Sequence, residues 1–189
     1  MCEKIINYMI MTVIGESGSG KSEYAENILI NLANSNNTAN EKKYYIATMQ
    51  PYGADAKKRI LRHHKLRENK GFSTIERYFD IGNCEIESGS NVLIECISNL
   101  TANEMFDISY SDGEDICKCV YEKICKGIYK LAEISENLVI VTNDIFCDGI
   151  IYDESTMSYI RLLGRINRYL ANISDKVAEV VYSCPVIIK

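Results

Sequence analysis

Short apolar runs alternate along this chain with segments in which apolar residues recur at helical spacing. Residues 9–14, 44–48, 92–96 and 138–142 are dominated by apolar, aromatic or β-branched side chains. Runs that are apolar almost throughout, rather than at every second position, are typical of strands buried on both faces. The segments between them carry apolar residues three and four positions apart, which predicts amphipathic helices. The pattern therefore predicts an α/β protein with a mostly parallel sheet and helices on both faces.

Periodicity and turn residues also predict where the remaining elements lie. Pro51, Gly53 and Asp55 indicate a loop before a basic helix. Two strands at the end of the chain flank Pro185 and are too close for a crossover, which predicts an antiparallel pair. No internal repeat is visible, and the length predicts one domain over residues 1–189. The other predicted elements are helices at 56–68, 101–106, 116–132 and 160–173, and strands at 72–77, 177–183 and 186–188.

Composition and charge narrow the class of protein. The chain is 47% apolar and 25% charged with a net charge of −5, so it has no overall basic field for binding nucleic acid. No apolar run approaches the length of a membrane-spanning helix. Residues 1–8 include an acid and lack an extended apolar segment, which makes them a poor signal peptide. We therefore expect a cytoplasmic protein with no membrane span.

The eight cysteines argue against a zinc site. None forms a C-x-x-C pair, and the chain has only two histidines. Cys117 and Cys119 are two positions apart on a predicted helix, where their side chains diverge. We expect free thiols, most of them buried.

Residues 15–22 fit the phosphate-binding loop motif G-x-x-x-x-G-K-[ST]. Glycines let the backbone turn sharply and direct several N–H groups to one centre. Lys21 supplies a positive charge for the β- and γ-phosphates, and Ser22 a hydroxyl for Mg²⁺. A chance match is the alternative, but a predicted strand precedes the loop and a predicted helix follows it, as the motif requires. The predicted phosphate contacts are Gly15, Glu16, Ser17, Gly18, Ser19, Gly20, Lys21 and Ser22.

Polar residues follow several predicted strands. Thr48, Glu95 and Asn143 are all expected at the carboxyl edge of the sheet, beside the phosphate-binding loop, where such sheets bind ligands. A carboxylate that ends an apolar strand is costly unless it is paired or faces a ligand. Glu95 is therefore a candidate second holder of Mg²⁺ with Ser22, and a salt-bridged strand end is the alternative.

Both histidines lie within a cluster of cations on the predicted helix 56–68. His63 and His64 are accompanied by six basic residues, and their side chains diverge on a helix. One interpretation is a solvated basic face with two incidental histidines. The other is a polyphosphate clamp, in which the cations keep one imidazole neutral and able to attack phosphorus. The six cations are Lys57, Lys58, Arg59, Arg62, Lys65 and Arg67.

The ordered set of motifs resembles the bifunctional adenosylcobinamide kinase / adenosylcobinamide-phosphate guanylyltransferase family of cobalamin synthesis. The likeness runs nearly end to end, and the phosphate-binding loop alone would not be specific. Its other motifs are Tyr24-Ala25-Glu26, Tyr45-Ile46-Ala47-Thr48 with Gln50, Arg59-Ile60-Leu61-Arg62-His63, Leu93-Ile94-Glu95-Cys96-Ile97, Asn103, Val141-Thr142-Asn143-Asp144, Gly149-Ile150 and Gly164-Arg165-Ile166-Asn167.

The resemblance implies a RecA-like P-loop fold, a homotrimer and two reactions. The first transfers the γ-phosphoryl group of ATP or GTP to a hydroxyl of adenosylcobinamide. The second transfers GMP from GTP to a histidine, and then to adenosylcobinamide phosphate, giving adenosylcobinamide-GDP. His63 matches the guanylylated residue, with His64 as its neighbour. The implied nucleotide contacts beyond the phosphate-binding loop are Thr48, Met49, Gln50, His64, Lys65, Leu66, Arg67, Glu76 and Glu95.

The chain also departs from the family pattern. Glu16 stands where a second glycine is usual and Gly18 where an arginine is usual, and Asp144 replaces a glutamate. Two other functions stay open at this point. One is a P-loop small-molecule kinase with no covalent step. The other is a nucleotide-binding regulator without turnover.

Overall fold

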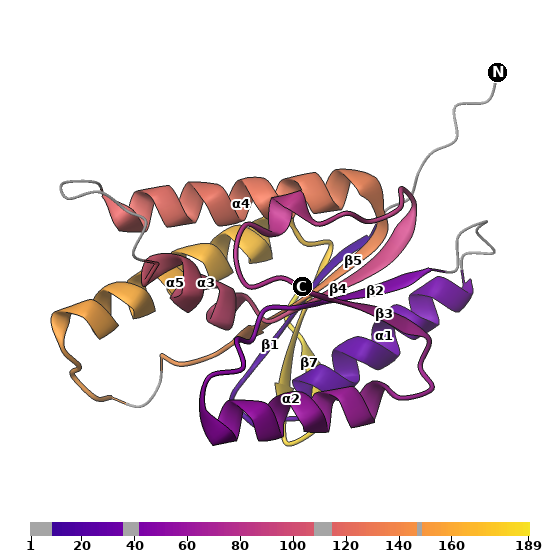
Figure 1. The fold of residues 1–189 in the computed structure, drawn as a ribbon, viewed down its shortest axis with the longest axis horizontal. Helices are drawn as coiled ribbons and strands as arrows, with labels where there is room; N and C mark the ends of the chain where they lie inside the picture. The colour runs from indigo at the N-terminus through magenta and orange to yellow at the C-terminus, as the bar shows by residue number, and fades with distance from the viewer. Residues whose placement is uncertain (1–8, 36–41, 108–114, 147–148) are drawn as a thin grey trace.

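The computed structural model describes residues 9–35, 42–107, 115–146 and 149–189. Cys2, Cys147 and the predicted N-terminal segment 1–8 lie outside that part. The core is a seven-stranded sheet of order β3-β2-β4-β5-β1-β6-β7 (Figure 1). The strands are β1 (Met9–Gly15), β2 (Lys43–Ala47), β3 (Phe72–Glu76), β4 (Ser90–Glu95), β5 (Ser135–Asn143), β6 (Lys176–Val181) and β7 (Cys184–Ile187). The helices are α1 (Lys21–Ser35), α2 (Gly53–Arg67), α3 (Ile97–Met105), α4 (Ile116–Ile134) and α5 (Glu154–Ile173), with a 3-10 turn at Ile81–Asn83.

The sheet topology confirms the predicted fold class. Strands β1 to β6 pair in parallel, and β6 and β7 form the expected antiparallel pair at the sheet edge. In this register Gly15 of β1 lies beside Asn143 of β5, and Ala47 of β2 lies beside Glu95 of β4. The carboxyl ends of four strands therefore meet at one edge, which also carries the phosphate-binding loop.

Both faces of the sheet are covered, which explains why its strands are apolar throughout. Successive strand side chains point to opposite faces, so Ile94 and Leu93 are both fully buried but belong to different cores. The first core lies under α3, α4 and α5, and the second under α1 (Figure 1). Two apolar layers on one sheet make a rigid platform for the edge where the strands end.

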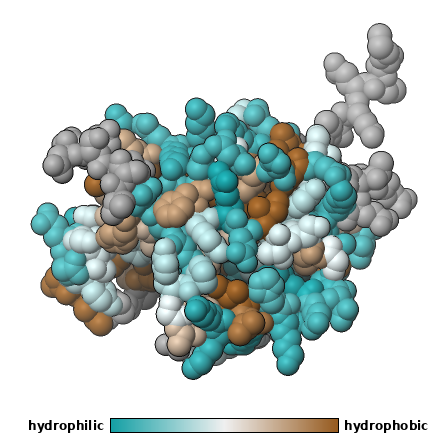
Figure 2. Space-filling model, viewed as in Figure 1, coloured by the Kyte–Doolittle hydropathy of each residue, from teal (hydrophilic) through white to brown (hydrophobic). Residues whose placement is uncertain are grey.

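Helix α2 is held differently from the others. Among its described side chains only Arg67 is buried, and the surface in this region is mixed, with a hydrophobic patch among hydrophilic side chains (Figure 2). Its start also corrects a prediction, because the helix begins at Gly53 rather than after a loop that runs to Asp55. Gly53 has a φ of +78°, so the glycine makes the sharp junction itself and the loop is shorter than its composition indicated.

Two other helices begin earlier than the periodicity predicted. Helix α3 starts at Ile97, one residue after the buried Cys96, so its first apolar residues are indistinguishable in sequence from the end of β4. Helix α5 starts at Glu154, six residues before the predicted start. Its first turns are polar, and the start is marked by a cap, in which Asp153 accepts hydrogen bonds from the N–H and hydroxyl of Thr156.

The cysteines are less buried than expected. Of the six described, only Cys96 is buried and Cys184 is exposed. Within the described ranges, no helix has both the length and the apolar character needed to cross a bilayer.

Candidate active site

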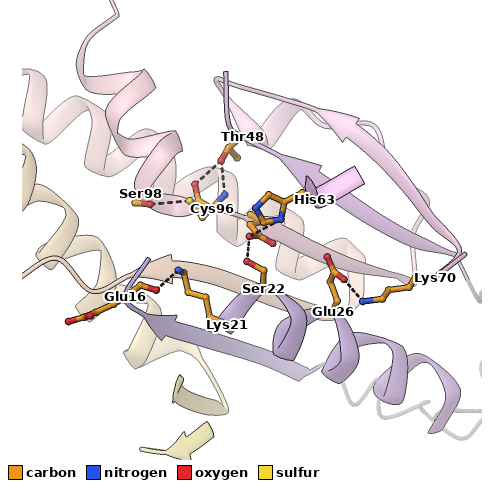
Figure 3. Close-up of polar contacts among 10 residues, drawn as sticks. Glu16, Lys21, Ser22, Glu26, Thr48, His63, Lys70, Cys96 and Ser98 are labelled. Atoms are coloured by element: carbon orange, nitrogen blue, oxygen red, sulfur yellow. Dashed lines mark hydrogen bonds and ion pairs between the residues drawn. The ribbon is translucent and has the colours of Figure 1, made fainter. Parts of the chain in front are cut away.

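The phosphate-binding loop joins the end of β1 to the start of α1. The N–H of Ser19 donates to the carbonyl of Glu16 at 3.2 Å, which closes the turn. The Nζ of Lys21 donates to the same carbonyl at 2.9 Å, so the lysine folds back over the loop (Figure 3). Burial lowers the pKa of Lys21, and the nearby Glu95 carboxylate opposes that shift. A buried cation hydrogen-bonded to a carbonyl is placed to exchange it for a stronger acceptor such as a phosphate oxygen.

A hydroxyl and a carboxylate meet beside the loop. Ser22, in the first turn of α1, donates a hydrogen bond to Oε1 of Glu95, the last residue of β4 (Figure 3). The other carboxylate oxygen of Glu95 is buried and makes no hydrogen bond within the part of the chain that the structure describes. A carboxylate and a hydroxyl are the hard oxygen donors that Mg²⁺ prefers, so this pair fits the predicted cation.

His63 approaches the same carboxylate from α2. Its Nδ1 lies 3.9 Å from Oε1 of Glu95, and its side chain is 25% exposed. Burial lowers the pKa of His63, and the positive charges of Arg67, Arg62 and Lys21 lower it further, while Glu95 raises it. The net direction is downward, which favours the neutral imidazole with a free lone pair.

A pocket opens between α2 and the ends of β2 and β4. The Arg67 guanidinium lies 3.5 Å from the centre of the Tyr45 ring and is buried. Its Nε and Nη1 atoms make no hydrogen bond to any described residue. Buried donors without acceptors are costly, so they suit a site where a ligand brings the acceptor atoms. The lining residues are Tyr45, Ala47, Met49, Ile60, His63, His64, Arg67, Glu76, Glu95, Cys96 and Asn99.

One third of the predicted site residues line this pocket. Six of the predicted nucleotide contacts or catalytic residues line this pocket, whereas Gln50 and Lys65 do not. Thr48 is fully buried, and its hydroxyl bonds both the N–H and the carbonyl of Cys96, so it positions the residue after Glu95. The side chain of Leu66 lies outside the described part of the chain. The six are Met49, His63, His64, Arg67, Glu76 and Glu95.

The basic cluster divides between the two interpretations that the sequence left open. Five of its six cations are exposed on the outer side of α2, as a solvated basic face would be. Arg67 and His63 turn inward toward Tyr45 and Glu95, respectively. Among the described residues of α2, only this inner face is therefore placed to contact a ligand in the pocket.

Residues that were not among the predicted nucleotide contacts complete the site. Tyr45 supplies the surface on which Arg67 lies, and Asn99 lines the pocket from the first turn of α3. The amide of Asn103 donates to the carbonyls of Thr48 and Tyr78 at 2.8 and 2.9 Å, which ties the exits of β2 and β3 together. Tyr45 and Asn103 belong to motifs of the family resemblance, and the alternation of β2 places Tyr45 on the face of the sheet that α1 covers.

A buried ion pair fixes the chain just after α2. Lys70 donates to Glu26 of α1 at 2.6 Å, and the carboxylate is almost fully buried (Figure 3). Burial raises the pKa of Glu26, and Lys70 opposes that shift. The pair joins the end of the histidine-bearing segment to the helix that begins with Lys21 and Ser22.

We expect Gly20→Ala to weaken nucleotide binding far more than Gly18→Ala. Gly20 has a φ of +92°, and a Cβ there would meet Oγ of Ser183 in the β6–β7 turn at 2.6 Å. Gly18 also has a positive φ, of +79°, but a Cβ there meets nothing. Backbone strain should cost each variant roughly 1–2 kcal/mol, and only Gly20→Ala must also displace the turn. Titration with a fluorescent nucleotide measures both, and equal losses would contradict the role of the turn contact.

Together, the strand, glycine loop and helix, the lysine over the loop and the adjacent hydroxyl–carboxylate pair define a P-loop nucleotide-binding protein. Comparison with known proteins then identifies the group to which it belongs. A family model described as cobinamide kinase / cobinamide phosphate guanyltransferase matches residues 11–188, and the chain belongs to that family.

Two similar proteins carry names that are consistent with this family. The chain is 28% identical over 195 residues to the bifunctional adenosylcobalamin biosynthesis protein CobU of Escherichia coli K12. It is 27% identical over 191 residues to the protein of the same name from Salmonella typhimurium LT2. Each alignment covers 96% of this chain and 100% of the relative.

Solved structures with similar folds are more distant. One of them, an ATPase domain, aligns with a TM-score of 0.47 at 6% identity, covering 90% of this chain and 68% of that one. The flagellar accessory protein FlaH from Methanocaldococcus jannaschii aligns with a TM-score of 0.45 at 10% identity, covering 96% and 78%.

Proposed function

We propose that this protein phosphorylates adenosylcobinamide with ATP or GTP, and that it transfers GMP from GTP, through a guanylylated His63, to adenosylcobinamide phosphate. The product of the second reaction is adenosylcobinamide-GDP. Family membership supports the pair of reactions. The observation that carries the covalent step is the position of His63, whose Nδ1 lies 3.9 Å from the carboxylate that also bonds Ser22.

Phosphoryl transfer requires positioning and charge neutralisation more than covalent chemistry. Lys21 and the N–H groups of the loop would bind the β- and γ-phosphates, and Ser22 and Glu95 would hold Mg²⁺. When bound there, the cation neutralises charge on the phosphate oxygens. The γ end of the nucleotide therefore lies on the β4 side of the loop, near Glu95.

Guanylyl transfer requires the α-phosphorus, rather than the γ-phosphorus, beside His63. We infer that GTP binds for this step with its pyrophosphate end on the loop and its guanosine toward the pocket of Arg67, Tyr45 and Glu76. The unpartnered Arg67 donors and the Tyr45 ring suit a polar, flat ligand there.

The covalent step requires only His63, GTP and the acceptor phosphate. The free imidazole nitrogen bonds to the α-phosphorus, and the bond from that phosphorus to the oxygen leading to the β-phosphate breaks, which releases pyrophosphate. A phosphate oxygen of adenosylcobinamide phosphate then attacks the same phosphorus, and the nitrogen–phosphorus bond breaks. His63 returns neutral, as its lowered pKa favours.

Mass spectrometry of the protein after incubation with GTP tests this function. We expect an added GMP on the peptide that contains residues 63 and 64, with fragmentation placing it on His63. Phosphorylated corrinoid without a protein adduct would support a kinase with no covalent step. Nucleotide binding with neither product would indicate a regulator.

The pH dependence of adduct formation tests the state of His63. A group whose pKa is lowered in the folded protein keeps its neutral form to lower pH. The rate of adduct formation should therefore stay level from neutrality down to the ordinary histidine value of 6.5 and decline only below it. Rapid-quench measurements across this range would show it, and a decline that starts above 6.5 would mean that Glu95 outweighs burial and the three cations.

We also infer a homo-oligomer, by family resemblance a trimer, that works as a single domain in the cytoplasm, where ATP and GTP are available. The edge strand β7 supports an assembly, because Val186 and Ile187 are more than half exposed.

A further inference from the structure

A second cavity, of about 560 Å³, lies on the other side of the phosphate-binding loop. Glu16 and Ser17 of the loop form one wall. Asp144 and Ile145, which follow β5, and Ile160 of α5 form the others. None of these residues takes part in the pocket that contains His63.

The backbone fixes this cavity to the loop. The N–H of Asp144 donates to the carbonyl of Gly15 at 3.1 Å, so the exit of β5 is hydrogen-bonded to the start of the loop. The carbonyl of Glu16, another lining residue, accepts the hydrogen bond from Lys21. The cavity therefore adjoins the lysine that is aimed at the β- and γ-phosphates.

The strand order places the cavity at the γ end of a bound nucleotide. Strand β5 lies between β4, which carries Glu95, and β1, which leads into the loop. Ser22 and Glu95 would hold a cation that neutralises charge on the phosphates at the end of β4, and the exit of β5 is the next strand end toward the loop. An acceptor that attacks the γ-phosphorus must approach from this opening.

The lining is mixed in a way that fits a large, amide-bearing ring system. Ile145, Ile160 and the Tyr159 ring offer apolar surface, and the Tyr159 hydroxyl donates to the carbonyl of Ser98 at 3.1 Å, which holds the ring in place. Glu16 and Asp144 add two carboxylates, which accept hydrogen bonds from amide N–H groups and alcohols.

We propose that this cavity binds the corrinoid acceptor, with its hydroxyl-bearing arm directed at the loop and the hydroxyl hydrogen-bonded to Asp144. This assignment rests on the proposed function and names the acceptor site for it. In the first reaction the hydroxyl oxygen bonds to the γ-phosphorus, the bond from that phosphorus to the nucleoside diphosphate breaks, and Asp144 accepts the hydroxyl proton. The phosphorylated arm then lies at the edge that His63 faces, so one acceptor site serves both transfers.

Filling the cavity should weaken corrinoid binding in both reactions. With Ile160→Trp we expect the KM for adenosylcobinamide in the kinase reaction, and for its phosphate in guanylyl transfer, to rise at least about tenfold. Formation of the GMP adduct from GTP alone involves no corrinoid and should stay within about twofold of the wild-type rate. Ile134→Trp, at the exposed end of α4, is the matched control and should change neither.

Asp144→Asn separates proton acceptance from a structural role. The amide keeps an oxygen for the Asp144–Phe146 backbone hydrogen bond but cannot accept a proton, so kcat of the kinase reaction should fall with little change in KM. An unchanged corrinoid KM in a folded Ile160→Trp variant would overturn the assignment. If Ile160→Trp slowed adduct formation from GTP as much as it slowed the two corrinoid reactions, the assignment would be overturned too. Absence of an adduct in the wild-type protein would instead overturn the covalent step and leave the kinase KM as the test of this site.

Discussion

Replacing His63 with alanine should abolish the GMP adduct while nucleotide binding persists. The imidazole is the one nucleophile of the protein that we propose to bond to phosphorus, and without it no nitrogen–phosphorus bond can form. Loss of a covalent nucleophile costs at least about a thousandfold in rate. Intact-mass measurement of the variant after GTP treatment should show only the unmodified protein, with guanylyl transfer to adenosylcobinamide phosphate lost in parallel.

His64→Ala is the matched control for that experiment. His64 lines the same pocket but is exposed, and the two neighbouring side chains diverge on α2. The control should keep the adduct, with a modest rise in KM for GTP. An adduct that survives His63→Ala and disappears in His64→Ala would transfer the role to the second histidine. If both variants lost nucleotide binding equally, the two histidines would contribute only to binding the phosphates, and neither would be the nucleophile.

The sheet and the phosphate-binding loop could be predicted because they depend on local pattern. Apolar runs mark the buried strands, and the glycine–lysine–serine order marks the loop, whatever packs around them. The same holds for Glu95, since a carboxylate at the end of an apolar strand indicates a ligand edge. The starts of α3 and α5 could not be placed, because one is hidden in an apolar run and the other is polar and depends on the Asp153 cap.

The inner surface of α2 depends on contacts between distant segments. Nothing near Arg67 in the sequence distinguishes it from the five exposed cations of the same helix. Its burial follows from Tyr45 on the neighbouring strand, 22 positions earlier in the chain. The second cavity is likewise assembled from the loop, the exit of β5 and α5, and Ile145 and Ile160 carry no motif that indicates it.

Lys21→Met should remove most nucleotide affinity without destabilising the folded protein. Lys21 is 7% exposed, and burial lowers its pKa, which means that keeping this charge inside the folded protein costs stability. Methionine has a similar length and carries no charge, so the melting temperature of the nucleotide-free protein should hold or rise. Nucleotide affinity should fall by about a hundredfold, since a charge-assisted bond to phosphate is worth roughly 1.5–3 kcal/mol.

Lys21→Met is informative because it should lower nucleotide affinity while it keeps or raises the melting temperature of the nucleotide-free protein. Binding of a nucleotide stabilises the folded state by an amount that grows with the logarithm of its concentration relative to Kd. GTP and ATP should therefore raise the melting temperature of the wild-type protein and of His63→Ala, but not of Lys21→Met. If Lys21 had only a structural role, Lys21→Met would lower the melting temperature of the nucleotide-free protein, and GTP and ATP would still raise the melting temperature of the variant. Because Lys21 serves the loop that both reactions share, adduct formation and corrinoid phosphorylation should be lost together, whereas His63→Ala removes the first and spares the second.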